Sequence, residues 1–122
     1  MELIKIISAR RTLEELFEKE DICAHLSYWM TKFVAKTEGE HAFYASEMRK
    51  LFDKYAVECE SDDGSVLIPN ENVAVFNAAV DELNKTDVED PGIRFNLSEL
   101  SAELRLSMKQ MYTLLDFINE DK

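Results

Sequence analysis

The strongest constraint on this fold is a run of helical periodicity that extends from Ile22 to Val57. If each residue turns a helix by about 100°, the apolar residues of this run fall within an arc of roughly 120°. Gly39 interrupts the run at a cost of about 1 kcal/mol relative to alanine, which a helix of this length tolerates or uses as a bend. The pattern therefore predicts one continuous amphipathic helix over residues 22–57, with an apolar side formed by Ile22, Leu26, Met30, Phe33, Val34, Tyr44, Met48, Leu51, Phe52 and Tyr55.

The predicted length of this helix has a consequence for assembly. Ile22, Phe33 and Tyr44 follow one another at intervals of eleven residues, which favours a straight or gently curved helix over a left-handed coiled coil. At about 1.5 Å per residue the helix would extend for roughly 50–55 Å, whereas a domain of this size is about 30–40 Å across. A second copy of the chain would cover the apolar side that extends past the domain. We therefore expect a homo-oligomer whose interface is formed by Ile22, Leu26, Met30, Phe33, Tyr44, Met48, Leu51 and Tyr55.

Two capping patterns predict helices near the ends of the chain. Thr12 followed three positions later by Glu15 is typical of a helix start and indicates a short helix over about residues 8–20. Ser107 and Gln110 repeat the pattern before a helix that runs to the C-terminus. Apolar residues recur on one side of this last helix, namely Met108, Met111, Tyr112, Leu115 and Ile118.

Shorter signals fill the chain between these helices. An acidic segment over residues 58–64 ends in a turn and precedes a strand over 66–68. A helix is predicted over 70–85, and alternating apolar residues indicate short strands over 93–97 and 103–106. The predicted fold is mainly α: one long helix, three shorter helices and a minor two- or three-stranded β element.

Charge divides this single predicted domain, residues 1–122, into two parts. Residues 1–57, the helical part that begins at about residue 8, contain nine Lys and Arg against ten Asp and Glu. Residues 58–122, the α+β part, contain five against fifteen, and the whole chain has a net charge of −11. Because an acidic surface repels phosphates, we expect no direct binding to nucleic acid.

The N-terminus and the cysteines indicate where the protein acts. The first apolar stretch is short and is followed by Arg10 and Arg11, which is the reverse of a secretory signal. Cys23 and Cys59 lie far apart and are typical of thiols in a reducing compartment. We expect a cytoplasmic protein that does not enter a membrane.

A basic and aromatic stripe is the main candidate binding site. Helical geometry brings four lysines, His25 and Phe43 within about 40° of one another, beside the apolar side and next to Trp29. Arg10 and Arg11 join them if the preceding helix folds back. Such a stripe suits an anionic ligand or an acidic partner surface, although the same lysines also suit a solvated flank. The predicted stripe comprises Arg10, Arg11, His25, Trp29, Lys32, Lys36, Phe43, Lys50 and Lys54.

Patterns for catalysis and metal binding are weak. No serine or cysteine has a recognisable nucleophile signature. The Glu-x-x-His pattern from Glu38 to His41 occurs once, whereas di-iron bundles need it twice. The turn Asp62–Gly64 lacks the flanking ligands of a calcium loop. We therefore expect no catalytic residues, no metal site and no cofactor, and we interpret the chain as a non-enzyme.

A series of segments carries a family resemblance: Arg49–Tyr55, Ile68–Asn72, Val75–Asn77, Glu82–Leu83, Thr86–Val88, Leu97–Leu100 and Leu115–Ile118. In this order they resemble a family of small proteins, with a domain of unknown function, from tailed bacteriophages and prophages of Gram-positive bacteria. The resemblance extends from about Leu13 to the C-terminus and includes no catalytic motif. It implies a viral protein that acts inside a bacterial host cell.

These features together predict a binding protein. The expected function is antagonism of host defence by a homo-oligomer that sequesters an anionic signalling nucleotide or occludes a defence protein. A tail assembly accessory or chaperone is the first alternative, because the same apolar side would pack on a virion protein. The second alternative is an acidic decoy that imitates DNA and binds a basic host protein.

Overall fold

The predicted helix over 22–57 is broken at Thr37. In the computed structural model, which describes residues 1–19, 21–58 and 66–119, the run forms helix α2 (Ala24–Lys36) and helix α3 (Glu38–Tyr55). The Thr37 hydroxyl donates to the Phe33 carbonyl at 2.7 Å, and the Arg10 guanidinium donates to the Val34 carbonyl. Side chains that insert into the ladder of backbone hydrogen bonds bend or break a helix. The prediction of one continuous helix is therefore wrong, and the break precedes Gly39.

The prediction of a mainly helical fold with a minor β element is confirmed. The other helices are α1 (Leu3–Leu16), α4 (Asn70–Asn84), α5 (Leu97–Glu103) and α6 (Met108–Leu114), which continues into the 3-10 turn η1 (Leu115–Phe117). Strand β1 (Val57–Glu58) pairs antiparallel with β2 (Val66–Leu67). Strand β3 (Phe95–Asn96) pairs parallel with β4 (Ile118–Asn119).

Several predicted boundaries are wrong. Helix α1 begins at Leu3, so Thr12 is a buried residue in its middle, where its hydroxyl shares a hydrogen bond of 2.6 Å with Thr113. The segment 103–106 is no strand, because Glu103 belongs to α5 and residues 104–106 have no regular structure. The last helix does not run to the C-terminus, because α6 ends at Leu114 and is followed by η1 and β4. The Ser107 capping box is confirmed by two bonds to Gln110, of 3.0 and 3.1 Å. Cys59 and the turn Asp62–Gly64 lie outside the described residues.

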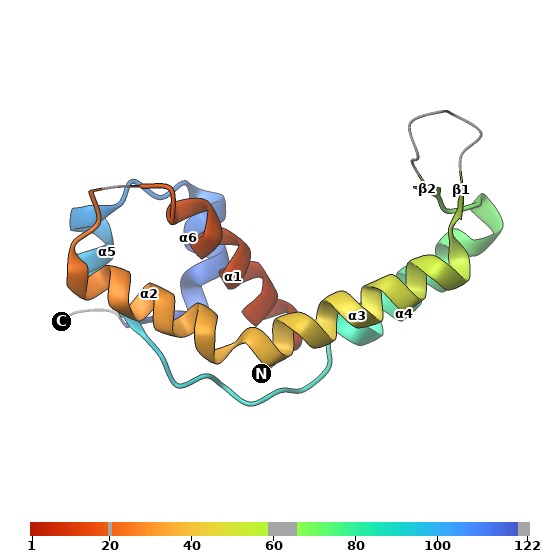
Figure 1. Cartoon of the computed structure of the whole chain (residues 1–122), viewed down its shortest axis with the longest axis horizontal. Helices are drawn as coiled ribbons and strands as arrows, with labels where there is room; N and C mark the ends of the chain where they lie inside the picture. The colour runs from red at the N-terminus through yellow and green to blue at the C-terminus, as the bar shows by residue number, and fades with distance from the viewer. Residues whose placement is uncertain (20, 59–65, 120–122) are drawn as a thin grey trace.

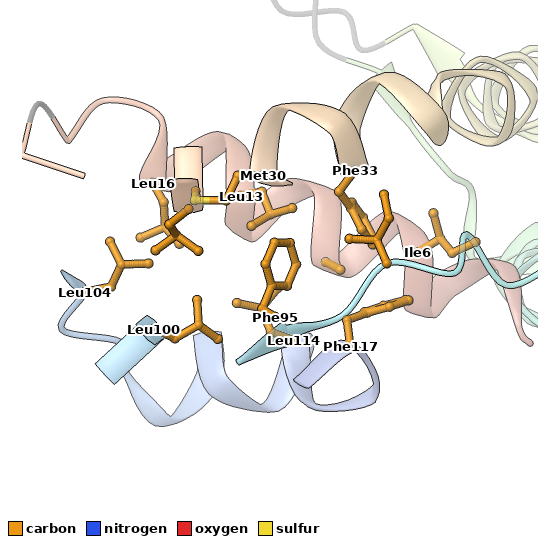
Figure 2. Close-up of a cluster of buried hydrophobic side chains, with 13 residues drawn as sticks. Ile6, Leu13, Leu16, Met30, Phe33, Phe95, Leu100, Leu104, Leu114 and Phe117 are labelled. Carbon is orange, nitrogen blue, oxygen red and sulfur yellow. The ribbon is translucent and has the colours of Figure 1, made fainter. Parts of the chain in front are cut away.

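Helices α1, α2, α5 and α6 enclose the main core, and with η1, β3 and β4 we call them the body (Figure 1). The body combines the two ends of the chain: α1 and α2 come from the N-terminal part, and α5 and α6 come from the C-terminal part. Figure 2 shows the core between them, where the Phe33 ring lies edge-on to that of Phe117, with centroids 4.9 Å apart. The buried core residues are Ile6, Ala9, Leu13, Leu16, Leu26, Met30, Phe33, Ile93, Phe95, Leu100, Leu104, Leu114 and Phe117.

Helices α3 and α4 lie side by side and extend away from the body, and we call this pair the arm (Figure 1). The arm is antiparallel: near its base Tyr44 donates to Asn84 at 2.9 Å, and near its tip Asn72 donates to the Tyr55 carbonyl at 3.1 Å. The side chains of α1 cover the base of the arm through a second cluster of Leu3, Ile7, Tyr44 and Leu83.

The predicted oligomer interface lies mostly inside the chain's own core. Leu26, Met30 and Phe33 are fully buried in the body, and Tyr44 is buried at the base of the arm. The remaining members are half-buried: Ile22 packs on the body core, Met48 and Leu51 pack on the second cluster, and Tyr55 contacts the Phe76 ring. The apolar side of the 22–57 run therefore packs on other parts of the same chain. The predicted excess of helix length over domain diameter gives no argument for a homo-oligomer.

Candidate functional site

Arg10, a predicted member of the basic stripe, is buried and has a structural role. The residue is 3% exposed. The guanidinium donates to the Val34 carbonyl, to the Thr37 hydroxyl at 3.1 Å and to the Glu38 carboxylate at 3.0 Å. These bonds hold α1 against the junction of α2 and α3. Arg10 is therefore unavailable to a ligand, which corrects its prediction as a binding residue, whereas Arg11 is exposed on the outer side of α1.

The stripe residues on α2 lie among acidic and aromatic groups. His25 Nδ1 is 2.7 Å from a carboxylate oxygen of Glu99, which reaches it from α5. Lys32 Nζ lies 5.7 Å from the centre of the Tyr28 ring and 5.8 Å from that of Trp29. His25, Trp29 and Glu99 line a cavity of about 230 Å³ between α2 and α5. The Glu99 carboxylate repels an anionic ligand, and Arg94, which also lines this cavity, is already paired with Asp90.

The remaining stripe residues are separated by the break at Thr37. Lys36 lines a small cavity together with Glu40, Glu89 and Asp90. On α3, Lys50 pairs with Glu47 at 3.0 Å, and Lys54 Nζ lies 5.2 Å from the centre of the Tyr55 ring. Phe43 is exposed on the same side of α3. The predicted stripe therefore divides into separate groups, and its lysines have acidic or aromatic neighbours.

A fixed ion pair lies in the connection from α4 to β3. The Asp90 carboxylate accepts hydrogen bonds from the Arg94 guanidinium and from the Gly92 backbone N–H, and they lower its pKa to about 2. The Arg94 guanidinium lies over the Phe117 ring at 5.5 Å and joins this connection to the core. Nearby, a hydrogen bond from the N-terminal ammonium at 2.8 Å lowers the pKa of Asp87.

The two most exposed large apolar side chains lie on α6, and a third exposed one follows on η1. Met108 is 92% exposed, Tyr112 78% and Leu115 56%, and their spacing puts them in one row on the outer side of the helix. Leu114 and Phe117 point to the core from the other side. Three residues of the predicted apolar side therefore lie on the outer side of the helix, whereas Met111 is half-buried and Ile118 packs on the body core. We call Met108, Tyr112 and Leu115 the α6 row.

A groove lies between the α6 row and α1. It has a volume of about 460 Å³ and is lined by Ile4 and Ser8 of α1 and by Tyr112 and Leu115, among others. Lys5 and Asp116 also line it and approach each other to 3.4 Å across it. This groove, in which Ile4, Tyr112 and Leu115 lie among polar and charged side chains, is the candidate site of the molecule.

The sequence contains this site without distinguishing it from core. Leu114 and Phe117 form an apolar pair at helical spacing, and so do the members of the α6 row. Which of the two sides is buried depends on where α1 packs, and α1 lies about a hundred residues earlier. Methionine and tyrosine, which are enriched at interfaces, were the only signal for the exposed side.

Within the described residues, no group of three or more His, Cys, Asp or Glu side chains is placed to hold a metal ion. No helix in the same part of the chain is long and apolar enough to span a membrane. Comparison with protein family models, with curated proteins and with solved structures gave no match. The resemblance to proteins of tailed phages therefore stays a prediction from the sequence segments.

Proposed function

We propose that the protein is a non-enzymatic binding protein that takes an amphipathic helix of another protein into the groove between α1 and α6. The observation that carries this proposal is the exposure of the α6 row: three large apolar side chains, 56–92% exposed, beside a groove of about 460 Å³. Contiguous apolar surface of this kind on a small domain marks sites of protein interaction.

The geometry of the groove suits a helix. Two antiparallel helices leave a trough along their line of contact, and a third helix fills it with residues spaced by three and four. Two side-chain hydrogen bonds between α1 and α6, Thr12 with Thr113 and Gln110 with Glu15, fix the position of one helix against the other.

This form of the proposal favours occlusion of a protein over sequestration of a nucleotide. The burial of Arg10 and the acidic neighbours of His25 and Lys36 weaken the stripe as an anion site. The setting in a phage-infected bacterium is part of the proposal and is supported by the sequence resemblance alone. The identity of the partner distinguishes the two functions expected from the sequence: a host defence protein indicates antagonism of defence, and a tail or capsid protein indicates virion assembly.

Photo-crosslinking tests the proposal directly. We replace Tyr112 with the photoreactive residue p-benzoylphenylalanine in producing cells, irradiate them and analyse the adducts by mass spectrometry. A discrete protein adduct is expected at this position. The matched control places the same residue at Ser101, which is exposed on α5 away from the groove, and no such adduct is expected there.

A second substitution separates specific docking from chance contact. Leu115→Lys, combined with the photoreactive residue at 112, places a charge in the row and should reduce the adduct at least about tenfold. An absence of any discrete adduct at 112, or an equal yield from 101, contradicts the proposed docking face.

A further inference from the structure

The cavity between α2 and α5 has a buried apolar side and a polar opening. Leu26 and Phe95 are each 2% exposed, whereas His25 and Asn96 are exposed. Trp29, which is half-buried, also lines the cavity. A recess that combines buried apolar groups with a few polar ones is typical of a small-molecule site. At about 230 Å³ the cavity is smaller than a site for a drug-sized molecule, so it suits a ligand with a single ring.

The charges around the cavity favour a cation. Glu99 lines the cavity, and its Oε1 bonds to His25 Nδ1 at 2.7 Å and accepts a long bond of 3.7 Å from Cys23 Sγ. A neutral imidazole can donate such a bond, so the bond by itself leaves the carboxylate negative. Arg94, the other permanently charged side chain among the described residues of the lining, is paired with Asp90. The net charge of −11 on the whole chain also attracts cations.

The aromatic residues of the cavity favour a ligand that carries a ring. The Trp29 indole lies edge-on to the Tyr28 ring, with centroids 5.3 Å apart. Lys32 Nζ lies near the Tyr28 hydroxyl, at 3.5 Å, and Lys32 is not among the described residues that line the cavity. The indole and the Phe95 ring are therefore the aromatic groups of the cavity. Aromatic rings attract both another ring and a cation.

We propose that this cavity binds a small aromatic amine in its ammonium form. The ring of the ligand packs on Leu26, Trp29 and Phe95, and the ammonium group donates hydrogen bonds to the Glu99 carboxylate. A metal ion would leave the apolar side of the cavity unused, and no cluster of ligands in the described part of the chain is placed to hold one. The cavity is separate from the groove between α1 and α6, so this site goes beyond the proposed function and does not depend on it.

Trp29 makes the site directly measurable, because it is the only tryptophan in the chain. Its fluorescence and its indole N–H signal in NMR both report on the cavity. We titrate the purified chain with phenethylamine at neutral pH, where the amine is protonated. Two matched probes separate the parts of the ligand: 2-phenylethanol keeps the ring without the charge, and methylamine keeps the charge without the ring. We expect saturable binding of phenethylamine and at least about fivefold weaker binding of each of the other two.

A substitution of Glu99 tests the carboxylate. Glu99→Gln removes the charge and keeps the shape of the side chain, so the affinity for phenethylamine should fall at least about fivefold. The affinity for 2-phenylethanol should not change, which a general loss of structure in α5 would not allow. Glu103→Gln is the matched control, because it makes the same change of charge on the same helix at a residue that does not line the cavity. It should leave both affinities unchanged, and circular dichroism confirms that each variant is folded.

Three results overturn the proposal: no saturable change in either Trp29 signal up to high millimolar phenethylamine, equal affinities of the wild type for phenethylamine and 2-phenylethanol, or undiminished binding of phenethylamine by Glu99→Gln. The outcome is distinct from that of the docking groove. Glu99→Gln should retain the photo-crosslink at position 112, so the failure of one proposal leaves the other standing.

Discussion

The body and the arm are both built mainly from helices but differ in how they bury their apolar residues. In the body, helices from both ends of the chain and the short β3–β4 pair surround one core, and Phe33 packs against the rings of both Phe95 and Phe117. In the arm, two helices form a single layer, and the buried side chains are Tyr44, Phe76 and Leu83 among the described residues. A single layer has no interior of its own. The arm therefore depends on its contacts with the body or with another molecule.

The dependence of the arm is greatest at its tip. Its base packs on α1 through the cluster that includes Leu3 and Ile7, whereas its outer part relies on contacts such as that between Phe52 and Phe76, with centroids 5.3 Å apart. Local opening is easiest where few apolar contacts must be broken. We expect amide hydrogen exchange to slow from the tip of the arm to its base, and to be slowest in α1 and α2.

The largest expected effect is that of removing the central ring of the body. Phe33→Ala should lower the free energy of unfolding by about 3–5 kcal/mol, because the side chain is fully buried and contacts two other rings. Urea denaturation followed by circular dichroism measures this change. Phe52→Ala in the arm is the matched control and should have a much smaller effect, because its ring is partly exposed. Equal losses would mean that the arm is as well packed as the body.

The junction between the two regions gives the next effect. Arg10→Met removes three hydrogen bonds at the break between α2 and α3 and leaves the Val34 carbonyl with only the long bond of 3.4 Å from the Thr37 hydroxyl. We expect a loss of about 2–3 kcal/mol and faster amide exchange around Thr37. Arg10→Lys should recover only part of the loss, because an ammonium lacks the planar fork of the guanidinium. Full recovery with lysine would show that charge alone holds the junction.

The junction also shows what the sequence could reveal. The periodicity of residues 22–57 correctly predicts helix on both sides of Thr37, because the apolar positions of each half obey the same spacing. The break depends on Arg10, a side chain on another helix, and no pattern within the run indicates it. Likewise, the spacing around α6 predicts a helix but not which side is buried, since Leu114 and Tyr112 both belong to apolar rows. The positions of these helices were predictable from local sequence patterns. The side that each helix buries depends on contacts with distant parts of the chain.

A smaller effect tests the base of the arm. Tyr44→Phe removes the hydrogen bond of 2.9 Å to Asn84 and keeps the ring in its cluster. We expect a loss of about 1 kcal/mol, with faster amide exchange in α4 and little change in α6. Exchange measured by mass spectrometry separates the two helices. An equal increase in both would show that arm and body unfold as one unit.

The smallest effect is electrostatic and lies in the connection that joins arm to body. The Arg94 guanidinium and the Gly92 N–H hold the pKa of Asp90 at about 2, below its ordinary value of 3.8. Because the pKa is lower in the folded protein than in the unfolded chain, this ion pair stabilises the fold above about pH 4, and the contribution is lost as the pH falls from about 4 to about 2. Both side chains are partly exposed, so Asp90→Asn should lower the free energy of unfolding at neutral pH by less than about 1 kcal/mol.

The diagnostic measurement for Asp90 is the slope of stability against pH. Between about pH 2 and pH 4 the Asp90→Asn variant should lose less stability than the wild type, because it no longer binds the proton that breaks the pair. Asp81→Asn, which removes an exposed carboxylate on α4, serves as the control and should leave more of that slope intact. Since Arg94 also lies over the Phe117 ring, a variant slope identical to that of the wild type would mean that this ring, and not Asp90, holds the connection against the body.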